Sequence, residues 1–205
     1  MTLRVEEVMG LAPVIPVLVI DRVDDAVPIA TALVAGGLPA IEVTLRTPAA
    51  LDVIRRMAGV EGAVVGAGTV LDARSLDAAV AAGARFIVSP GLSEQVVRAA
   101  ADASVPLLPG VATASDIMRG LDLGLSCFKF FPAVAAGGVP ALAALSSPFA
   151  AVRFCPTGGV TQENAPAWLA LDTVRCVGGS WVVPRGTADF ATVEIRARTA
   201  SALAR

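Results

Sequence analysis

The sequence of 205 residues predicts an α/β protein, a (β/α)8 TIM barrel built as a single domain over residues 1–205. Three observations lead to this prediction. Eight short apolar runs alternate with eight alanine-rich amphipathic segments, and strands that alternate with helices form a parallel sheet. Several helical segments end at a glycine, which is typical of a helix C-terminus. Small, polar or proline residues follow nearly every apolar run, as expected for a pocket at the carboxyl ends of barrel strands.

The apolar runs are too short for helices and are bounded by turn residues, so each is interpreted as a buried strand. In chain order the expected strands are 14–20, 40–44, 63–66, 86–89, 106–108, 127–131, 152–155 and 174–177. The helices expected between and after them are 23–35, 48–57, 73–82, 93–101, 114–121, 139–145, 163–169 and 187–203.

A doubly wound open sheet is the alternative to the barrel. That fold calls for a Gly-x-Gly-x-x-Gly turn after an early strand, and the Gly66-Ala67-Gly68-Thr69 segment is only a fragment of it. Eight strand–helix units therefore favour the barrel.

Composition excludes several classes of function. Hydrophobic residues make up 55% of the chain, but the longest uncharged stretch, 130–152, is interrupted by prolines and glycines, so we expect no membrane span. The first residues carry no signal-like apolar core, which favours a cytoplasmic protein. The net charge of −2 and the absence of a basic stripe argue against a nucleic-acid partner.

The chain contains no histidine and no tyrosine, which limits its chemistry further. Histidine-dependent triads and histidine metal ligands are impossible, so a general acid or base must be Asp, Glu, Lys, Cys or water. The three cysteines are expected to be buried free thiols, and their spacing offers no zinc site.

Lys129 is the single lysine of the chain, against fifteen arginines, and it lies between phenylalanines in an expected strand. An apolar setting disfavours the ammonium form and leaves a nucleophilic amine, which can form a Schiff base with a ketone. The alternative is a side chain that extends its charge outward to solvent. Arginine would serve that purpose equally well, so we interpret Lys129 as functional.

Glu42 is the one acid within any expected strand. Strand alternation places Glu42 on the same side as Thr44 and Arg46, facing the barrel mouth. A buried carboxylate is costly unless it is paired or used. Glu42 is therefore interpreted as a general acid and base beside Lys129, with a structural ion pair to Arg46 as the alternative.

The remaining candidates suit an anionic substrate. The Arg46 guanidinium matches a carboxylate, and Thr69 and Thr157 could donate to substrate oxygens. The loops that follow the last two strands contain glycines, at which backbone N–H groups can approach a phosphate. These loop residues are Gly158, Gly159, Gly178, Gly179 and Ser180. Ordinary turn chemistry is the alternative for each loop taken alone.

Seven segments, in the right order over roughly residues 10–185, resemble the 2-keto-3-deoxy-6-phosphogluconate (KDPG) aldolase family, which also acts on 4-hydroxy-2-oxoglutarate. The segments are PVIPV at 13–17, EVTLR at 42–46, VGAGTV at 65–70, SPG at 89–91, FKFFP at 128–132, RFCPTGG at 153–159 and GGSW at 178–181. The resemblance implies a homotrimeric class I lyase of the Entner–Doudoroff pathway that needs no metal and no cofactor. Its products would be pyruvate and glyceraldehyde 3-phosphate.

The resemblance also implies roles for individual residues. Lys129 matches the Schiff-base lysine and Glu42 the proton-transfer acid, while Arg46 and Thr69 match residues that hold the pyruvate portion. Thr157 matches a threonine linked to stereochemical choice at C4. The expected phosphate-binding and remaining substrate-binding residues are Gly158, Gly159, Ser180, Gly179 and Pro90. The segment before the first strand is short for the family, which predicts a weaker cap over the closed end of the barrel.

Two other functions remain open on the residues alone. Another phosphate-binding barrel enzyme, such as an isomerase, would use the same glycine loops without a lysine and a glutamate in strands. A non-catalytic sugar-phosphate sensor would keep the loops but have no reason to keep both Lys129 and Glu42.

Overall fold

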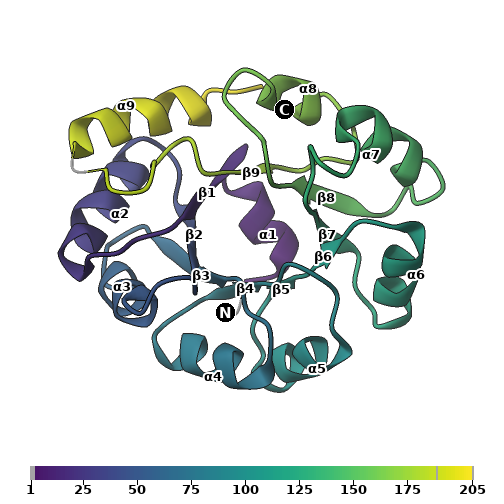
Figure 1. Ribbon diagram of the computed structural model, residues 1–205, viewed down its shortest axis with the longest axis horizontal. Coiled ribbons are helices and arrows are strands. Elements are labelled where there is room, and N and C mark those ends of the chain that lie inside the picture. The colour runs from purple at the N-terminus through teal and green to yellow at the C-terminus, as the bar shows by residue number, and fades with distance from the viewer. Residues whose placement is uncertain (1–2, 188, 205) are drawn as a thin grey trace.

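The structure, a computed structural model, describes residues 3–187 and 189–204. Its strands form an inner ring and the helices that follow them form an outer ring, which confirms the predicted barrel (Figure 1). Every strand pairing in the described residues is parallel. The strands are β1 Val14–Leu18, β2 Ala40–Thr44, β3 Val64–Gly68, β4 Phe86–Val88, β5 Leu107–Leu108, β6 Gly110–Val111, β7 Cys127–Phe130, β8 Arg153–Pro156 and β9 Val177–Gly179.

The helices lie close to the expected segments, apart from a short first helix that was not predicted. They are α1 Val5–Gly10, the 3-10 turn η1 Val23–Asp25, α2 Ala26–Ala35, α3 Ala50–Met57, α4 Ala73–Ala81, α5 Glu94–Asp102, α6 Ala114–Asp122, α7 Gly138–Ser146, α8 Ala165–Leu169 and α9 Phe190–Ser201. Within the described ranges, no helix is long and apolar enough to cross a membrane.

The fifth strand, expected at 106–108, corresponds to β5, and a second short strand, β6, which was not predicted, follows it beyond Pro109. Proline has no N–H, so it cannot donate to a neighbouring strand, but its carbonyl accepts a hydrogen bond from the Lys129 N–H at 2.8 Å. β5 pairs with β4, and β6 pairs with β7. The two short strands thus join the β5-β4-β3-β2-β1-β9 sheet to the β6-β7-β8 sheet at one side of the barrel.

The barrel closes on its other side between β8 and the chain leading into β9. Parallel bridges link Phe154 to Val174 and Thr157 to Gly178. The last strand begins later than expected, at Val177, and extends to Gly179. The loops that follow β8 and β9 therefore start side by side.

The third strand extends further than predicted, because beyond Gly66 it also includes Ala67 and Gly68. The sequence places these residues at the end of the strand and in the following loop. In the structure, five consecutive pairs with β2 hold them in extended conformation, and this pairing overrides the low strand propensity of glycine.

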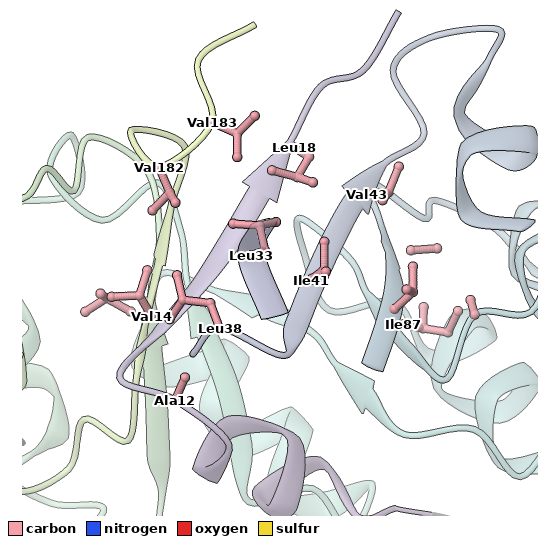
Figure 2. Close-up of a cluster of buried hydrophobic side chains, with 14 of the residues drawn as sticks. Ala12, Val14, Leu18, Leu33, Leu38, Ile41, Val43, Ile87, Val182 and Val183 are labelled. Carbon is pink, nitrogen blue, oxygen red and sulfur yellow. The ribbon is translucent and has the colours of Figure 1, made fainter. Parts of the chain in front are cut away.

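The larger hydrophobic core lies between the strands and the surrounding helices. Leu18 and Ile41, from neighbouring strands, lie close to Leu33 of α2 (Figure 2). Strand residues in this core alternate with residues that point into the barrel, as the period of a strand requires.

A second core fills the lower part of the barrel interior. Helix α1 lies at the centre of the ring (Figure 1) and contributes Val8 and Met9, which are 2% and 0% exposed. The short segment before β1 still caps this end of the barrel, because its six-residue helix places two apolar side chains in this core. The other members are Ile15, Ala40, Val64, Phe86, Val88, Leu108, Cys127, Cys155 and Cys176.

Candidate active site

Lys129 lies in β7, where Cys127 and Lys129 point into the barrel and Phe128 and Phe130 pack beneath the helices. The Phe130 ring lies 6.3 Å from that of Trp168 in α8, and both phenylalanines belong to the outer core. The Lys129 side chain is buried, and its Nζ lies 5.3 Å from the centre of the Phe131 ring. The lysine thus does not extend its charge to solvent, which disfavours the alternative interpretation.

Glu42 lies in β2 and is also buried, with 3% of its surface exposed. Its Oε1 accepts a hydrogen bond from Lys129 Nζ at 3.3 Å, although 87 positions separate the two residues. Burial strengthens the interaction between these opposite charges, since little water screens them. The partner of Glu42 is therefore Lys129 and not Arg46, which is exposed.

Arg46 and Thr69 meet at the mouth of the barrel. The Nε–H of Arg46 donates to Thr69 Oγ1 over 3.2 Å. Thr69 has a φ of 61°, a left-handed conformation that β-branched residues rarely adopt. The adjacent Gly68 carbonyl is fixed by the Leu45 N–H at 2.8 Å. The structure thus brings together two residues that the sequence assigned to one task.

Pro90 follows β4 and is half-buried. Its carbonyl lies so close to Gly110 that a Cβ built at Gly110 would be 2.1 Å from the oxygen. Gly110 is in turn the register partner of Lys129. Pro90 therefore lies one strand away from the lysine, on the β6 side.

Thr157 begins the loop after β8 and is buried. Its hydroxyl donates to the Cys155 carbonyl at 3.3 Å, and Cys155 is the register partner of Lys129. Gly178, across the bridge to the last strand, leaves space for the threonine: a Cβ there would be 2.2 Å from Thr157 Oγ1. The hydroxyl is thereby held between the lysine strand and the last strand.

The two glycine loops lie next to each other, as the Thr157–Gly178 bridge requires. Gly158 and Gly159 have φ values of 101° and 77°, which a residue with a side chain would adopt only with strain. The Gly158 carbonyl accepts a hydrogen bond from the Val134 N–H at 3.0 Å, so the loop is anchored through its backbone. At the end of the neighbouring strand β9, and not in the loop as predicted, Gly179 is buried against the Trp181 ring, and Ser180, which begins the following loop, is exposed.

Sequence analysis missed an ion pair that joins the loops after β1 and β9. Arg185 donates from Nε and Nη2 to the two carboxylate oxygens of Asp21, at 2.8 and 2.7 Å. The hydrogen bond with Arg185 is the main cause that lowers the pKa of Asp21 from its ordinary value. Both residues lie in loops, where no periodic pattern indicates which side chains will meet.

Away from the mouth, burial raises the pKa of the Cys127 thiol to about 11. The three cysteines are buried, as predicted. A thiol with this pKa is protonated near neutral pH and is a poor nucleophile. Cys127 therefore belongs to the packing of the barrel interior.

The sequence matches the family described as KDPG and KHG aldolase over residues 5–195. The chain belongs to this family. A curated aldolase of the family, the 2-dehydro-3-deoxy-phosphogluconate aldolase of Zymomonas mobilis, is 57% identical over 201 residues, covering 98% of this chain and 97% of the relative.

Solved structures of KDPG aldolases are also similar to this chain. The crystal structure of the enzyme from Zymomonas mobilis ATCC 29191 superposes with a TM-score of 0.97 at 57% identity, covering 99% of this chain and 98% of that one. The enzyme from Legionella pneumophila, with pyruvate captured at low pH as a covalent carbinolamine intermediate, has a TM-score of 0.94 at 43% identity and covers 98% and 100% of the two chains. The KDPG and KHG aldolase family thus shares this barrel over nearly its whole length.

Proposed function

We propose that this chain is a class I aldolase that cleaves KDPG to pyruvate and glyceraldehyde 3-phosphate, and that it also acts on 4-hydroxy-2-oxoglutarate. The observation that carries the proposal is the buried Lys129–Glu42 pair, with 3.3 Å between nitrogen and oxygen. Such a pair provides an amine for Schiff-base formation and an acid to move protons. Family membership and the carbinolamine in the Legionella relative support the same chemistry.

The reaction begins when Lys129 passes a proton to Glu42 and its free amine attacks the C2 ketone. Glu42 then returns this proton to the carbinolamine hydroxyl, which leaves as water and gives an iminium ion. Glu42, through a water molecule, then takes the proton of the C4 hydroxyl, the C3–C4 bond breaks, and the electron pair moves into the iminium to form an enamine. Glyceraldehyde 3-phosphate leaves, the enamine is protonated at C3, and water releases pyruvate and the lysine. Condensation is the reverse.

Arg46 and Thr69 hold the substrate carboxylate in this proposal, because a guanidinium offers two parallel donors to a carboxylate. Pro90 bounds the same pocket. Thr157 contacts the C4 side of the substrate, where it can influence which epimer is accepted. Thr157 follows two positions after Cys155, the register partner of Lys129, which supports this assignment.

The two glycine loops bind the phosphate group. Gly158, Gly159 and Gly179 allow close approach of backbone N–H groups, and Ser180 supplies an exposed hydroxyl. 4-Hydroxy-2-oxoglutarate has no phosphate, so Ser180→Ala should raise the KM for KDPG by about 10-fold or more and leave the KM for the smaller substrate unchanged. Steady-state kinetics on both substrates measure this, and an equal effect on both would remove Ser180 from the phosphate site.

The decisive test is reductive trapping. Protein incubated with pyruvate, reduced with borohydride and analysed by mass spectrometry should gain one adduct at Lys129, which is the single lysine of the chain. Lys129→Arg keeps a positive charge but should lose both adduct and turnover. Glu42→Gln should still form the adduct while cleavage slows by about two orders of magnitude or more. A chain that forms no adduct would instead be a sensor or a different phosphate-binding barrel enzyme.

We also propose a single barrel domain, a homotrimer and a cytoplasmic location. The trimer rests on the resemblance to the family, and the buried cysteines suit a reducing compartment. Light scattering in solution tests the trimer, which should have three times the 20.7 kDa mass of one chain.

A further inference from the structure

Gly68, the last residue of β3, lies directly against the carboxylate of Glu42. A Cβ built at Gly68 would be 2.1 Å from Glu42 Oε1 and 2.7 Å from both Cδ and Cγ. Real Cβ atoms essentially never come this close to another heavy atom, so one of the two groups would have to move. Glycine at this position thus creates the space that the Glu42 side chain occupies.

The backbone itself does not require glycine at this position. Gly68 is absent from the residues with positive φ, unlike Gly158 and Gly159 in the loop after β8. It lies in a strand that is paired on both sides, and glycine there weakens the strand. The benefit of the missing side chain is therefore space and not conformation.

We propose that Gly68 is a positioning residue that sets the place of the Glu42 carboxylate against Lys129; the inference rests on the proposed aldolase function. The two charged groups are 3.3 Å apart, near the limit of a hydrogen bond, and Glu42 is almost fully buried. A methyl group at residue 68 would therefore displace the carboxylate out of line with the lysine. Proton transfer depends on such alignment more than formation of the Schiff base does.

The neighbouring interior glycine has a different role. Gly66, also on β3, is the register partner of Glu42, yet a Cβ there would meet the ring of Phe86 at 2.4 Å. Phe86 belongs to the apolar core of the barrel interior. Of the two glycines, Gly68 is thus the one that faces the reacting groups.

Exchange of the pyruvate methyl protons with deuterated water isolates the proton-transfer step. The Lys129 iminium loses a methyl proton to Glu42 and becomes an enamine, which then takes up deuterium; NMR follows the exchange. For Gly68→Ala we expect borohydride trapping with pyruvate to stay within about two-fold, while exchange falls by about 10- to 100-fold.

A double-mutant comparison separates positioning from general damage. If Gly68 acts through Glu42, Gly68→Ala should slow exchange no further in a Glu42→Gln background. Gly36→Ala is the matched control: its Cβ would lie 2.4 Å from Ala197, in the contact between α2 and α9. That variant should lose stability and keep the exchange rate of the folded protein.

Should Gly68→Ala fail to fold, its combination with Glu42→Ala should fold as well as Glu42→Ala alone, since the space has been restored. A double variant that still fails to fold would overturn the inference. So would normal exchange by Gly68→Ala, or a further loss of exchange in the Glu42→Gln background. Normal exchange by Glu42→Gln alone would instead contradict the proposed role of Glu42.

Discussion

At the scale of single residues, Thr69 has an unfavourable backbone conformation at the mouth of the barrel. A β-branched residue at a φ of 61° costs about 1–3 kcal/mol, and it persists where the surrounding structure fixes it. Here the Thr69 hydroxyl accepts the Nε–H of Arg46 at 3.2 Å. The strain thus coincides with the position of the proposed carboxylate-binding arginine.

We expect Thr69→Gly to separate stability from binding. Glycine adopts this φ without strain, which stabilises the folded chain, but it also makes the unfolded chain more flexible, which favours unfolding. Because these two effects oppose each other, the free energy of unfolding should change by less than about 1 kcal/mol. Pyruvate affinity, measured by borohydride trapping against concentration, should fall by about 10-fold because a donor and the support of Arg46 are lost.

Ser104→Gly is the matched control for this prediction. Ser104 is the other non-glycine residue with a positive φ in the described part of the chain, at 52°. It lies in the turn after α5, so its substitution should leave pyruvate affinity unchanged. Retained affinity in Thr69→Gly would contradict the role assigned to Thr69.

At the scale of elements, local signals predicted most helices and strands, and errors occurred where long-range pairing decides the structure. The N-cap residue of α4 is Asp72, whose side chain accepts a hydrogen bond from the Ser75 N–H. A helix start of this kind depends only on residues close together in the sequence. Gly68 reads locally as a loop residue, but pairing with β2 makes it part of a strand. The missed helix α1 has only six residues, and its stability comes from burial against the barrel.

The same distinction explains which parts of the site were predictable. Glu42 and Lys129 lie in strands, so the strand period and the barrel topology were enough to bring them together. The contact of Gly68 with Glu42 depends on the position of a side chain, which periodicity does not specify. The Asp21–Arg185 pair joins two loops 164 positions apart, and no sequence pattern relates them.

The Asp21–Arg185 pair predicts a pH-dependent contribution to stability. The pKa of Asp21 is lower in the folded chain than in the unfolded chain, so its contribution is fully present above the unfolded value near 3.9 and is lost as the pH falls through the folded value. Asp21→Asn should therefore be slightly less stable than the parent chain at pH 7, with a smaller difference at pH 3, below the unfolded value. The effect is small because both side chains are exposed.

Urea unfolding at the two pH values measures this difference. Glu194→Gln removes an exposed ion pair within α9 alone, to Arg198, and serves as the control. The Asp21–Arg185 pair connects the loop after β1 to the loop that follows β9, which contains part of the proposed phosphate site. Asp21→Asn should therefore also raise the KM for the phosphorylated substrate, and Glu194→Gln should not. A stability difference that persists unchanged at pH 3 would contradict the assignment.

At the scale of the whole molecule, stability and chemistry lie at opposite ends of the barrel. The lower interior is an apolar core closed by α1, and the upper interior holds Glu42, Lys129 and the glycine loops. This is the usual division in barrel enzymes, in which the carboxyl ends of the strands carry function. The two ends should therefore respond independently to substitution.

Met9 tests this division, because it is fully buried and lies in α1, at the end opposite the active site. Met9→Ala leaves a cavity in the lower core and should lower the free energy of unfolding by about 2–5 kcal/mol. The kcat and KM of the folded fraction should be unchanged, since no proposed catalytic or binding residue belongs to that core. Denaturant unfolding and kinetics below the unfolding transition measure both quantities. A large fall in kcat at full folding would show instead that the packing of α1 determines the geometry of the Lys129–Glu42 pair.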